Sequence, residues 1–328
     1  MRAGWYERNG AARDVLQIGE LPTPNAGPGE VRVRLHASGV NPSDVKKRAG
    51  ARGQVIADPK VIPHSDGAGI IDQIGPGVSM ARLGERVWLH SAQFQRAMGT
   101  AAEYVTVPQG LVTRLPNNTS FAAGACIGIP VMTAHRCVFA DGMVTGRTVL
   151  VTGGAGAVGF YAIQLAKWAG ARVITTVSSE AKQAAALRAG ADIVINYKLG
   201  DVADQVREVI GADGVDRIID VDFGANIQTS LKVLRSGGAI VSYASMAVPE
   251  PQIPFYGLMG KNALMRLVLV YSMGPEAIAA ACADITRWLD TGDRAHLLTE
   301  HYSLDQLAAA HEAVEANTKI GGVVVDLA

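Results

Sequence analysis

The stretch RTVLVTGGAGAVG, residues Arg147–Gly159, decides the fold predicted for this chain. Its beginning, Val149–Val151, is a short apolar run rich in β-branched residues, which is typical of a strand buried on both faces. Three glycines follow with the spacing G-x-G-x-x-G. The next segment, FYAIQLAKWAG, carries apolar residues at helical spacing and ends at Gly170, which predicts a helix with a glycine just past its end.

Strand, glycine turn and helix come in the order that a dinucleotide site needs. Gly154 permits the tight turn, Gly156 lets the backbone approach a pyrophosphate, and Gly159 brings helix and strand together. The N–H groups of Ala157 and Val158, at the helix start, then face the phosphates. The spacing alone is weak evidence in a chain with 37 glycines, where an ordinary turn is the alternative. The flanking strand and helix favour the dinucleotide site.

Length and composition limit the class of protein. A chain of 328 residues predicts two domains, and 48% apolar with 18% charged residues is typical of a soluble globular protein. The formal net charge is zero, so nothing favours nucleic acid or an anionic membrane as a partner. No apolar run approaches the roughly 20 residues of a membrane span, and the N-terminus lacks a signal-peptide pattern. Three scattered cysteines fit reduced thiols, so we expect a cytoplasmic protein.

The residues before about position 120 predict a β-rich domain. Glu30–Ala37 (EVRVRLHA) alternates apolar and charged positions, as a strand with one solvated face does. Prolines and glycines flank it, and further short strands are predicted at residues 69–74, 86–89 and 102–107. Short strands with frequent turns favour a barrel-like or sandwich-like unit.

From about Phe121 the pattern changes to alternating strands and helices. After the glycine turn and its helix, strands are predicted at residues 172–177, 192–197, 216–221 and 239–243, with helices between them. This alternation predicts a parallel sheet covered on both faces. The tail holds a strand-like run at 266–271, a helix at 275–289, a helix opened by the capping box Ser303-x-x-Gln306 and running to about Ala316, and a strand at 323–327. With both strands and helices, the tail is able to return to the first domain.

Several segments resemble the medium-chain dehydrogenase/reductase superfamily, in particular its zinc-free quinone reductase and zeta-crystallin branch. The matching pieces are ASGVNPSDVKKRAG (37–50), IPHSDGAG (62–69), GERVW (84–88), AEYVTVP (102–108), GACIGIPVMTAH (124–135) and VTGGAGAVG (151–159). They follow the family's order and spacing over nearly the whole chain. The resemblance implies an α/β protein with a GroES-like barrel in residues 1–123, a Rossmann nucleotide-binding domain in 124–264 and a return of 265–328 to the first domain. It also implies an active site in the cleft between the domains.

The resemblance bears on zinc as well. Zinc-dependent members of the superfamily place a cysteine where this chain has Asn41 and a histidine where it has Ser65. They often carry a four-cysteine lobe in the interval that matches residues 89–98, which hold no cysteine here. Asn and Ser are poor zinc ligands, and the remaining pair, His64 and Asp66, is too small a ligand set. We therefore expect no metal.

Without a Lewis acid, the cofactor must carry the difficult chemistry. Hydride transfer from a nicotinamide then suits an acceptor that is already electrophilic, such as a quinone or an α,β-unsaturated carbonyl. The leading interpretation is an NADPH-dependent quinone oxidoreductase. One alternative is an NADPH-dependent enone or enoyl-thioester double-bond reductase, and another is a nucleotide-binding protein without turnover, like a lens crystallin.

The resemblance implies three catalytic candidates. Asn41 faces the active site in the family and its amide is able to donate to a developing oxyanion, or it is only a turn residue before Pro42. Lys46 stands where many quinone reductases have a tyrosine, so it is an oxyanion donor, a proton source or a solvated charge. Thr133 matches a position beside the nicotinamide, with a helix residue bonding its own backbone as the alternative. We expect His135 to be structural.

The strand at 172–177 indicates which dinucleotide binds. An NAD site places Asp or Glu at the end of this strand, but here the next residues are serines, and the Ser178 hydroxyl can donate to a 2′-phosphate. Lys182 supplies a positive charge. In the resembling quinone reductases, a lysine near this point and a tyrosine matching Tyr197 complete the phosphate pocket. Glu180 is contrary evidence, because a small shift would place it on the ribose. We expect NADPH.

The resemblance also implies a homodimer, because related proteins usually join the edges of their nucleotide-binding sheets. The strand-like run Leu264–Tyr271 is the candidate edge, since an unpaired strand edge is a template for pairing.

Overall fold

The computed structural model describes residues 1–53, 55–56, 58–316 and 319–327. The chain forms two compact units. The first combines Met1–Ile129 with Cys282–Ala328, and the second is Pro130–Ala281. The domain limits at residues 123 and 264, which the sequence suggested, stay a proposal.

The second unit is built on a six-stranded parallel sheet, so the predicted α/β class with a parallel sheet is confirmed. The strand order is β10-β9-β8-β11-β12-β13. The strands are β8 (Thr148–Val151), β9 (Arg172–Val177), β10 (Ile193–Asn196), β11 (Val215–Asp220), β12 (Leu234–Ser242) and β13 (Leu264–Leu267). The strand that leads into the glycine turn, β8, pairs with β9 and β11, and its residues Val149–Val151 are buried, as the apolar run predicted.

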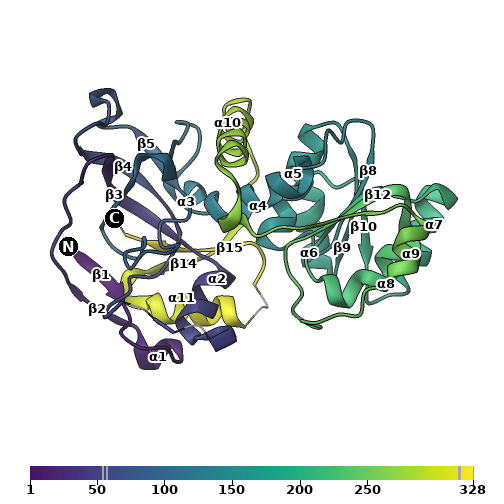
Figure 1. The fold of residues 1–328 in the computed structure, drawn as a ribbon, viewed down its shortest axis with the longest axis horizontal. Coiled ribbons are helices and arrows are strands. Elements are labelled where there is room, and N and C mark those ends of the chain that lie inside the picture. The colour runs from purple at the N-terminus through teal and green to yellow at the C-terminus, as the bar shows by residue number, and fades with distance from the viewer. Residues whose placement is uncertain (54, 57, 317–318, 328) are drawn as a thin grey trace. The chain divides into compact units, whose positions relative to one another are not determined.

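Helices cover this sheet on both faces (Figure 1). They are α5 (Ala157–Trp168), α6 (Glu180–Arg188), α7 (Val202–Ile210), α8 (Phe223–Val233) and α9 (Phe255–Gly260). Apolar residues of α7 and α8, such as Val206 and Ile227, pack with Leu150, Ile174 and Ile218 of the strands in one buried cluster. The helix α5 ends as predicted, because Gly170 just past it adopts φ +81°, a conformation that glycine tolerates best.

The first unit contains a seven-stranded sheet. Its path is β14-β15-β3-β4-β5-β7, with β6 also paired to β3. The long strand β3 (Glu30–Val40) confirms the alternation read from the sequence, because Val31, Val33 and Leu35 point into a buried cluster. Its partners are β4 (Asp66–Ile74), β5 (Arg86–Leu89), β6 (Tyr104–Pro108) and β7 (Val112–Arg114), and a separate ribbon pairs β1 (Arg2–Trp5) with β2 (Gln17–Glu20).

The chain's last segment adds two strands to this sheet. After α10 (Pro275–Asp290), β14 (Leu298–Ser303) and β15 (Gly322–Asp326) pair in parallel, and β15 pairs antiparallel with β3. The Ser303–Gln306 capping box is confirmed, although it opens a 3-10 turn that leads into α11 (Leu307–Glu315). Helix α11 packs its apolar residues against Val45 of α2 (Pro42–Ala49), and Figure 1 shows α1 (Ala12–Val15), α2 and α11 together.

Two shorter helices, α3 (Phe121–Gly124) and α4 (Gly128–Phe139), precede β8. The predicted strand-like run at 266–271 is wrong in its second half, because β13 ends at Leu267 and a 3-10 turn follows at Val270–Ser272. The neighbouring strand β12 ends at Ser242, the partner of Leu267, so β12 itself offers no residue for positions 269–271 to pair with. In the described ranges, no helix combines the length and apolar character that crossing a bilayer requires.

Candidate functional site

The glycine turn between β8 and α5 is sterically specified. A Cβ at Gly154 would lie 2.0 Å from Thr175 Oγ1, and one at Gly159 would lie 2.3 Å from the carbonyl oxygen of Gly153. Neither position has room for a side chain. A Cβ at Gly156 would make one tight contact, 3.3 Å from the carbonyl oxygen of Gly153, and would meet no other atom of the described residues within 4 Å. The geometry agrees with a turn held tight by its first and third glycines and approachable at its second.

The turn delivers backbone donors to the start of α5. The first intrahelical bond runs from Phe160 N–H to Gly156 O at 2.9 Å, so the N–H groups of Ala157, Val158 and Gly159 precede it. Such a helix start attracts phosphate. A further glycine, Gly153, also shapes the turn with φ +69°, and the adjacent pair of glycines in TGG was the signal for it.

The residues predicted for a 2′-phosphate come together at the carboxyl ends of β9 and β10. Lys182 Nζ donates to Ser178 Oγ at 3.2 Å. Tyr197 N–H donates to Val177 O at 3.1 Å, which places Tyr197 beside the end of β9, and its side chain is 49% exposed. Glu180 is the exposed first residue of α6, close in sequence to the same point. The group is half-exposed, polar and cationic, with one acidic neighbour.

The sequence did not predict a role for a buried carboxylate that lies at the carboxyl end of strand β11. Asp220, the last residue of β11, accepts from Thr152 Oγ1 at 2.8 Å and from Asn226 Nδ2 at 2.7 Å. Burial raises its pKa. Thr152 opens the glycine turn, so Asp220 ties that turn to β11. Its position at the end of a buried parallel strand was the available signal.

In the first unit, Asn41 lies at the start of α2 and is only 5% exposed. Its Nδ2 donates to Asp66 Oδ2 at 2.8 Å, and its backbone N–H donates to Asp44 Oδ2 at 2.7 Å. Asp66 also accepts from the backbone N–H of Ile129 at 2.8 Å. Burial raises the pKa of Asp66 well above its usual range. One of the two amide N–H donors of Asn41 is therefore committed inside the protein.

The helix α2 carries the other polar groups near Asn41. Burial raises the pKa of Asp44 to about 7, although the N–H of Asn41 and the charge of Lys47 oppose the rise. Lys47 is half-buried, its Nζ donates to Gln93 O at 3.4 Å, and burial lowers its pKa. Lys46 is also half-buried.

The remaining candidate, Thr133, lies on α4 together with His135, which we expect to be structural. Thr133 and His135 are both buried, at 5% and 6% exposure, in the part of α4 that belongs to the second unit. The His135 ring packs on Phe139 with 4.8 Å between centroids. Asn41 and Lys46 belong to the first unit.

The described residues contain no group of three or more His, Cys, Asp or Glu side chains placed to hold a metal ion. Of the two residues considered for a reduced ligand set, His64 bonds to Ser38 and His311, and Asp66 bonds to Asn41 and Ile129. Burial raises the pKa values of Cys126 and Cys137 to about 12, so both thiols hold their protons at neutral pH.

Two family models match the chain. A model described as an alcohol dehydrogenase GroES-like domain matches residues 27–117, in the first unit. A model described as a zinc-binding dehydrogenase matches residues 157–287, mostly in the second. Both matches agree with the fold predicted for the two parts of the chain.

Relatives and solved structures match over nearly the whole length. Human quinone oxidoreductase is 30% identical over 303 residues, covering 92% of this chain and 90% of the relative. A 2-haloacrylate reductase from a Burkholderia species is 28% identical, covering 93% of each. The structure of an NAD-dependent alcohol dehydrogenase has a TM-score of 0.89 at 28% identity, and that of a mycobacterial protein complexed with NADPH has 0.86 at 27%, each covering 100% of both chains. The likeness therefore extends across different acceptors and both nicotinamide cofactors.

Proposed function

Because the chain belongs to the medium-chain dehydrogenase/reductase superfamily, in its quinone oxidoreductase branch, and is an oxidoreductase, we propose that it is an NADPH-dependent quinone oxidoreductase that acts without zinc. The observation that carries the proposal is Asn41, a buried amide held by Asp66 at the position where zinc-dependent members have a metal ligand. An amide offers a neutral hydrogen-bond donor and no Lewis acid. Such a site suits an acceptor that needs no activation by a metal.

The chain's residues fit the cofactor. NADP(H) binding is supported for this family by the NADPH complex among its structural relatives. The backbone at Gly156 and the N–H groups of Ala157 and Val158 would hold the pyrophosphate. Ser178, Lys182 and Tyr197 would hold the 2′-phosphate, which a carboxylate at the end of β9 would repel.

Bound NADPH supplies a hydride to the acceptor. We assign to the Asn41 amide, whose Nδ2 is held by Asp66, a hydrogen bond to the acceptor oxygen as negative charge develops on that oxygen. Asp66 orients the amide for that task. Lys46, one turn into α2, is assigned as a further donor or the proton source, and Thr133 as a residue that orients the nicotinamide.

The second candidate is an NADPH-dependent enone or enoyl-thioester double-bond reductase. Lys46 favours it, because it replaces the tyrosine that many quinone reductases have at this position. The similarity to a 2-haloacrylate reductase, an enzyme named for an activated alkene, points the same way.

Oxidation of NADPH measured with a panel of small quinones, and in parallel with enones and enoyl thioesters, tests the proposal. A higher kcat/KM for the quinones than for the enones and enoyl thioesters supports the proposal. Preference for the alkenes would replace it with the second candidate. Tight NADPH binding without turnover on either panel would leave a nucleotide-binding protein.

We also propose that the protein is a cytoplasmic homodimer. The edge strand β13 and the residues after it expose Leu264, Leu267 and Leu269, at 43%, 72% and 60%. An apolar sheet edge of this kind favours pairing with a second copy. All three cysteines are free, which agrees with a reducing compartment.

A further inference from the structure

A chain of hydrogen bonds crosses the buried interior of the first unit. His311 Nε2 lies 2.9 Å from His64 Nε2, His64 Nδ1 lies 2.7 Å from Ser38 Oγ, and Ser38 Oγ lies 2.7 Å from Thr100 Oγ1. Thr100 Oγ1 then donates to the backbone carbonyl of Asp66. Each of the five residues is at most 2% exposed, although they come from four separate segments of sequence.

The backbone carbonyl fixes the direction of the first bonds. A carbonyl oxygen only accepts, so the hydroxyl proton of Thr100 is committed to Asp66. Ser38 then donates its own proton to Thr100 at 2.7 Å, a much shorter bond than its 3.5 Å contact with the same Asp66 carbonyl. The Ser38 oxygen is then left to accept from His64, which requires a proton on His64 Nδ1.

The two histidines extend the same direction. Burial lowers the pKa of His64 to about 3 and that of His311 well below its usual value, so both rings are neutral at neutral pH. A neutral ring with a proton on Nδ1 accepts at Nε2, and His311 must therefore donate from its own Nε2. The centroids of the two rings are 5.1 Å apart, and their Nε2 atoms are 2.9 Å apart. The difference equals the distance from a ring centre to its nitrogen, counted once for each ring. The bond therefore lies along the line of the ring centres, as a linear hydrogen bond requires.

The far end of the chain of bonds reaches the candidate site. Asp66 begins β4, and the carbonyl that Thr100 holds belongs to the same residue whose carboxylate holds Asn41 Nδ2. We propose that His311 is a positioning residue for Asn41, acting through His64, Ser38, Thr100 and Asp66. This inference rests on the proposed function, because only there does Asn41 touch the acceptor.

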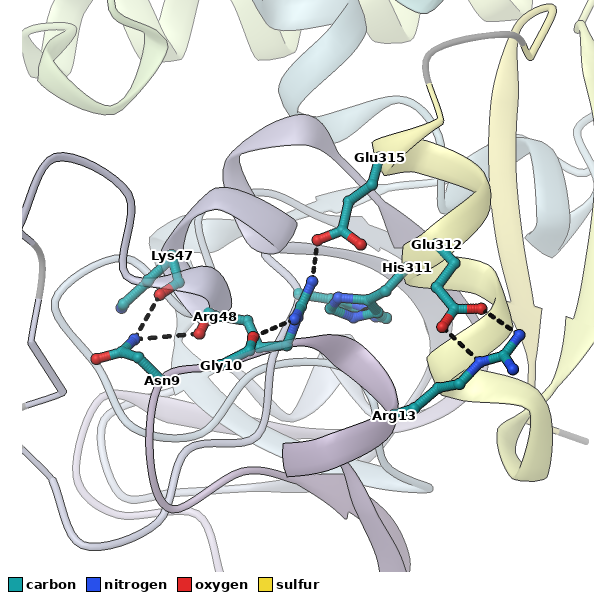
Figure 2. Close-up of polar contacts among 9 residues, drawn as sticks. Asn9, Gly10, Arg13, Lys47, Arg48, His311, Glu312 and Glu315 are labelled. Atoms are coloured by element: carbon teal, nitrogen blue, oxygen red, sulfur yellow. Dashed lines mark hydrogen bonds and ion pairs between the residues drawn. The ribbon is translucent and has the colours of Figure 1, made fainter.

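Polar contacts hold helix α11, which carries His311 at the start of the hydrogen-bond chain. Arg48, on α2 and wholly buried, donates to Glu315 at the end of α11 and to the carbonyl of Gly10, and Arg13 pairs with Glu312 on the same helix (Figure 2). The charge of Arg48 also lowers the pKa of His311, which keeps that ring neutral. The helix that carries His311 is thus bonded to the helix that Asn41 opens.

The proton arrangement is tested directly by nitrogen NMR of the full chain with labelled histidine. We expect a proton on Nδ1 of His64, the form that free histidine disfavours, and a proton on Nε2 of His311. A His64 ring protonated on Nε2 would overturn the inference, because the bond to His311 would then run the other way.

The coupling to Asn41 is tested with Thr100→Val, which keeps the side-chain shape and removes the bond to Asp66. Thr119→Val, a buried threonine of the same unit bonded only to Asn118 Oδ1 at 3.3 Å through its hydroxyl in the described structure, is the matched control. We expect Thr100→Val to shift the side-chain amide signal of Asn41 and to lower kcat roughly tenfold, with an unchanged KM for NADPH. Ser38→Ala should do the same, should Thr100→Val fail to fold. His311→Gln, which keeps a donor, should retain more activity than His311→Leu.

The two proposals fail differently. Wild-type protein that does not reduce quinones, or an Asn41→Ala variant with undiminished turnover, would defeat the proposed function. The Asn41 amide signal would then decide the positioning role by itself: a shift in Thr100→Val but not in Thr119→Val supports it. An Asn41 signal and a kcat that match wild type in a folded Thr100→Val protein would overturn it.

Discussion

Lys182 Nζ donates to Ser178 Oγ at 3.2 Å across the start of α6, so the cation and the hydroxyl predicted for a 2′-phosphate are already in contact. Ser179 caps α6 through a bond from Lys182 N–H to its hydroxyl at 3.4 Å, which fixes where the lysine leaves the helix. Hydrogen-bond donors therefore lie next to the end of β9, and Glu180 is the acidic residue that follows this strand in the sequence.

We therefore expect Lys182→Ala to raise the dissociation constant for NADPH about ten- to hundredfold and to leave NADH nearly unchanged. A charge-assisted hydrogen bond is worth about 1.5–3 kcal/mol, which corresponds to that range. Titration of the cofactor by fluorescence or calorimetry measures both constants. Lys232→Ala, at the exposed end of α8, is the control. Equal weakening of NADPH and NADH would instead assign the ribose to Glu180.

The zinc content can be measured directly. We expect purified protein to contain far less than one zinc per chain and to keep its activity after treatment with a chelator, because Asn41 and Ser65 stand where zinc-dependent relatives have ligands. Elemental analysis and an activity assay before and after chelation provide the two measurements. Close to one zinc per chain would contradict this prediction and would favour a zinc-dependent alcohol dehydrogenase instead.

The sequence correctly predicted those features of the fold that depend on a local pattern of residues. The glycine turn and the bounds of β9 follow from residues that are neighbours in the chain, and both are confirmed. The short strands β1, β2 and β14 and the helix α2 were missed, because four to eight residues give too little periodicity. The partners of the candidate residues were missed for another reason. Asn41 and Asp66 are 25 positions apart, and His64 and His311 are 247 apart, so only the fold brings them together.

The homodimer proposal predicts that Leu267→Glu yields monomers. Leu267 is 72% exposed at the end of the edge strand β13, and a buried, unpaired carboxylate in a sheet-to-sheet interface would be strongly unfavourable. Light scattering at micromolar concentration measures the mass. Leu187→Glu, at a 50% exposed leucine of α6, should leave the mass at twice that of the chain. Wild-type protein with the mass of a single chain would defeat the proposal.

The last prediction concerns Asp44 and the dependence of stability on pH. Burial raises the pKa of Asp44 from 3.8 to about 7, so between these values the folded protein keeps a proton that the unfolded chain releases. The free energy of unfolding contributed by Asp44 therefore falls as pH rises from 3.8 to about 7, and is constant above. Asp44→Asn keeps an oxygen able to accept from Asn41 N–H and removes the titration. Urea unfolding of both proteins across this range should show the stability of the variant relative to wild type rising by about 4 kcal/mol. Buried histidines such as His64 act in the opposite direction, but they are common to both proteins and cancel in the difference. A difference that does not change with pH would show that Asp44 stays ionised.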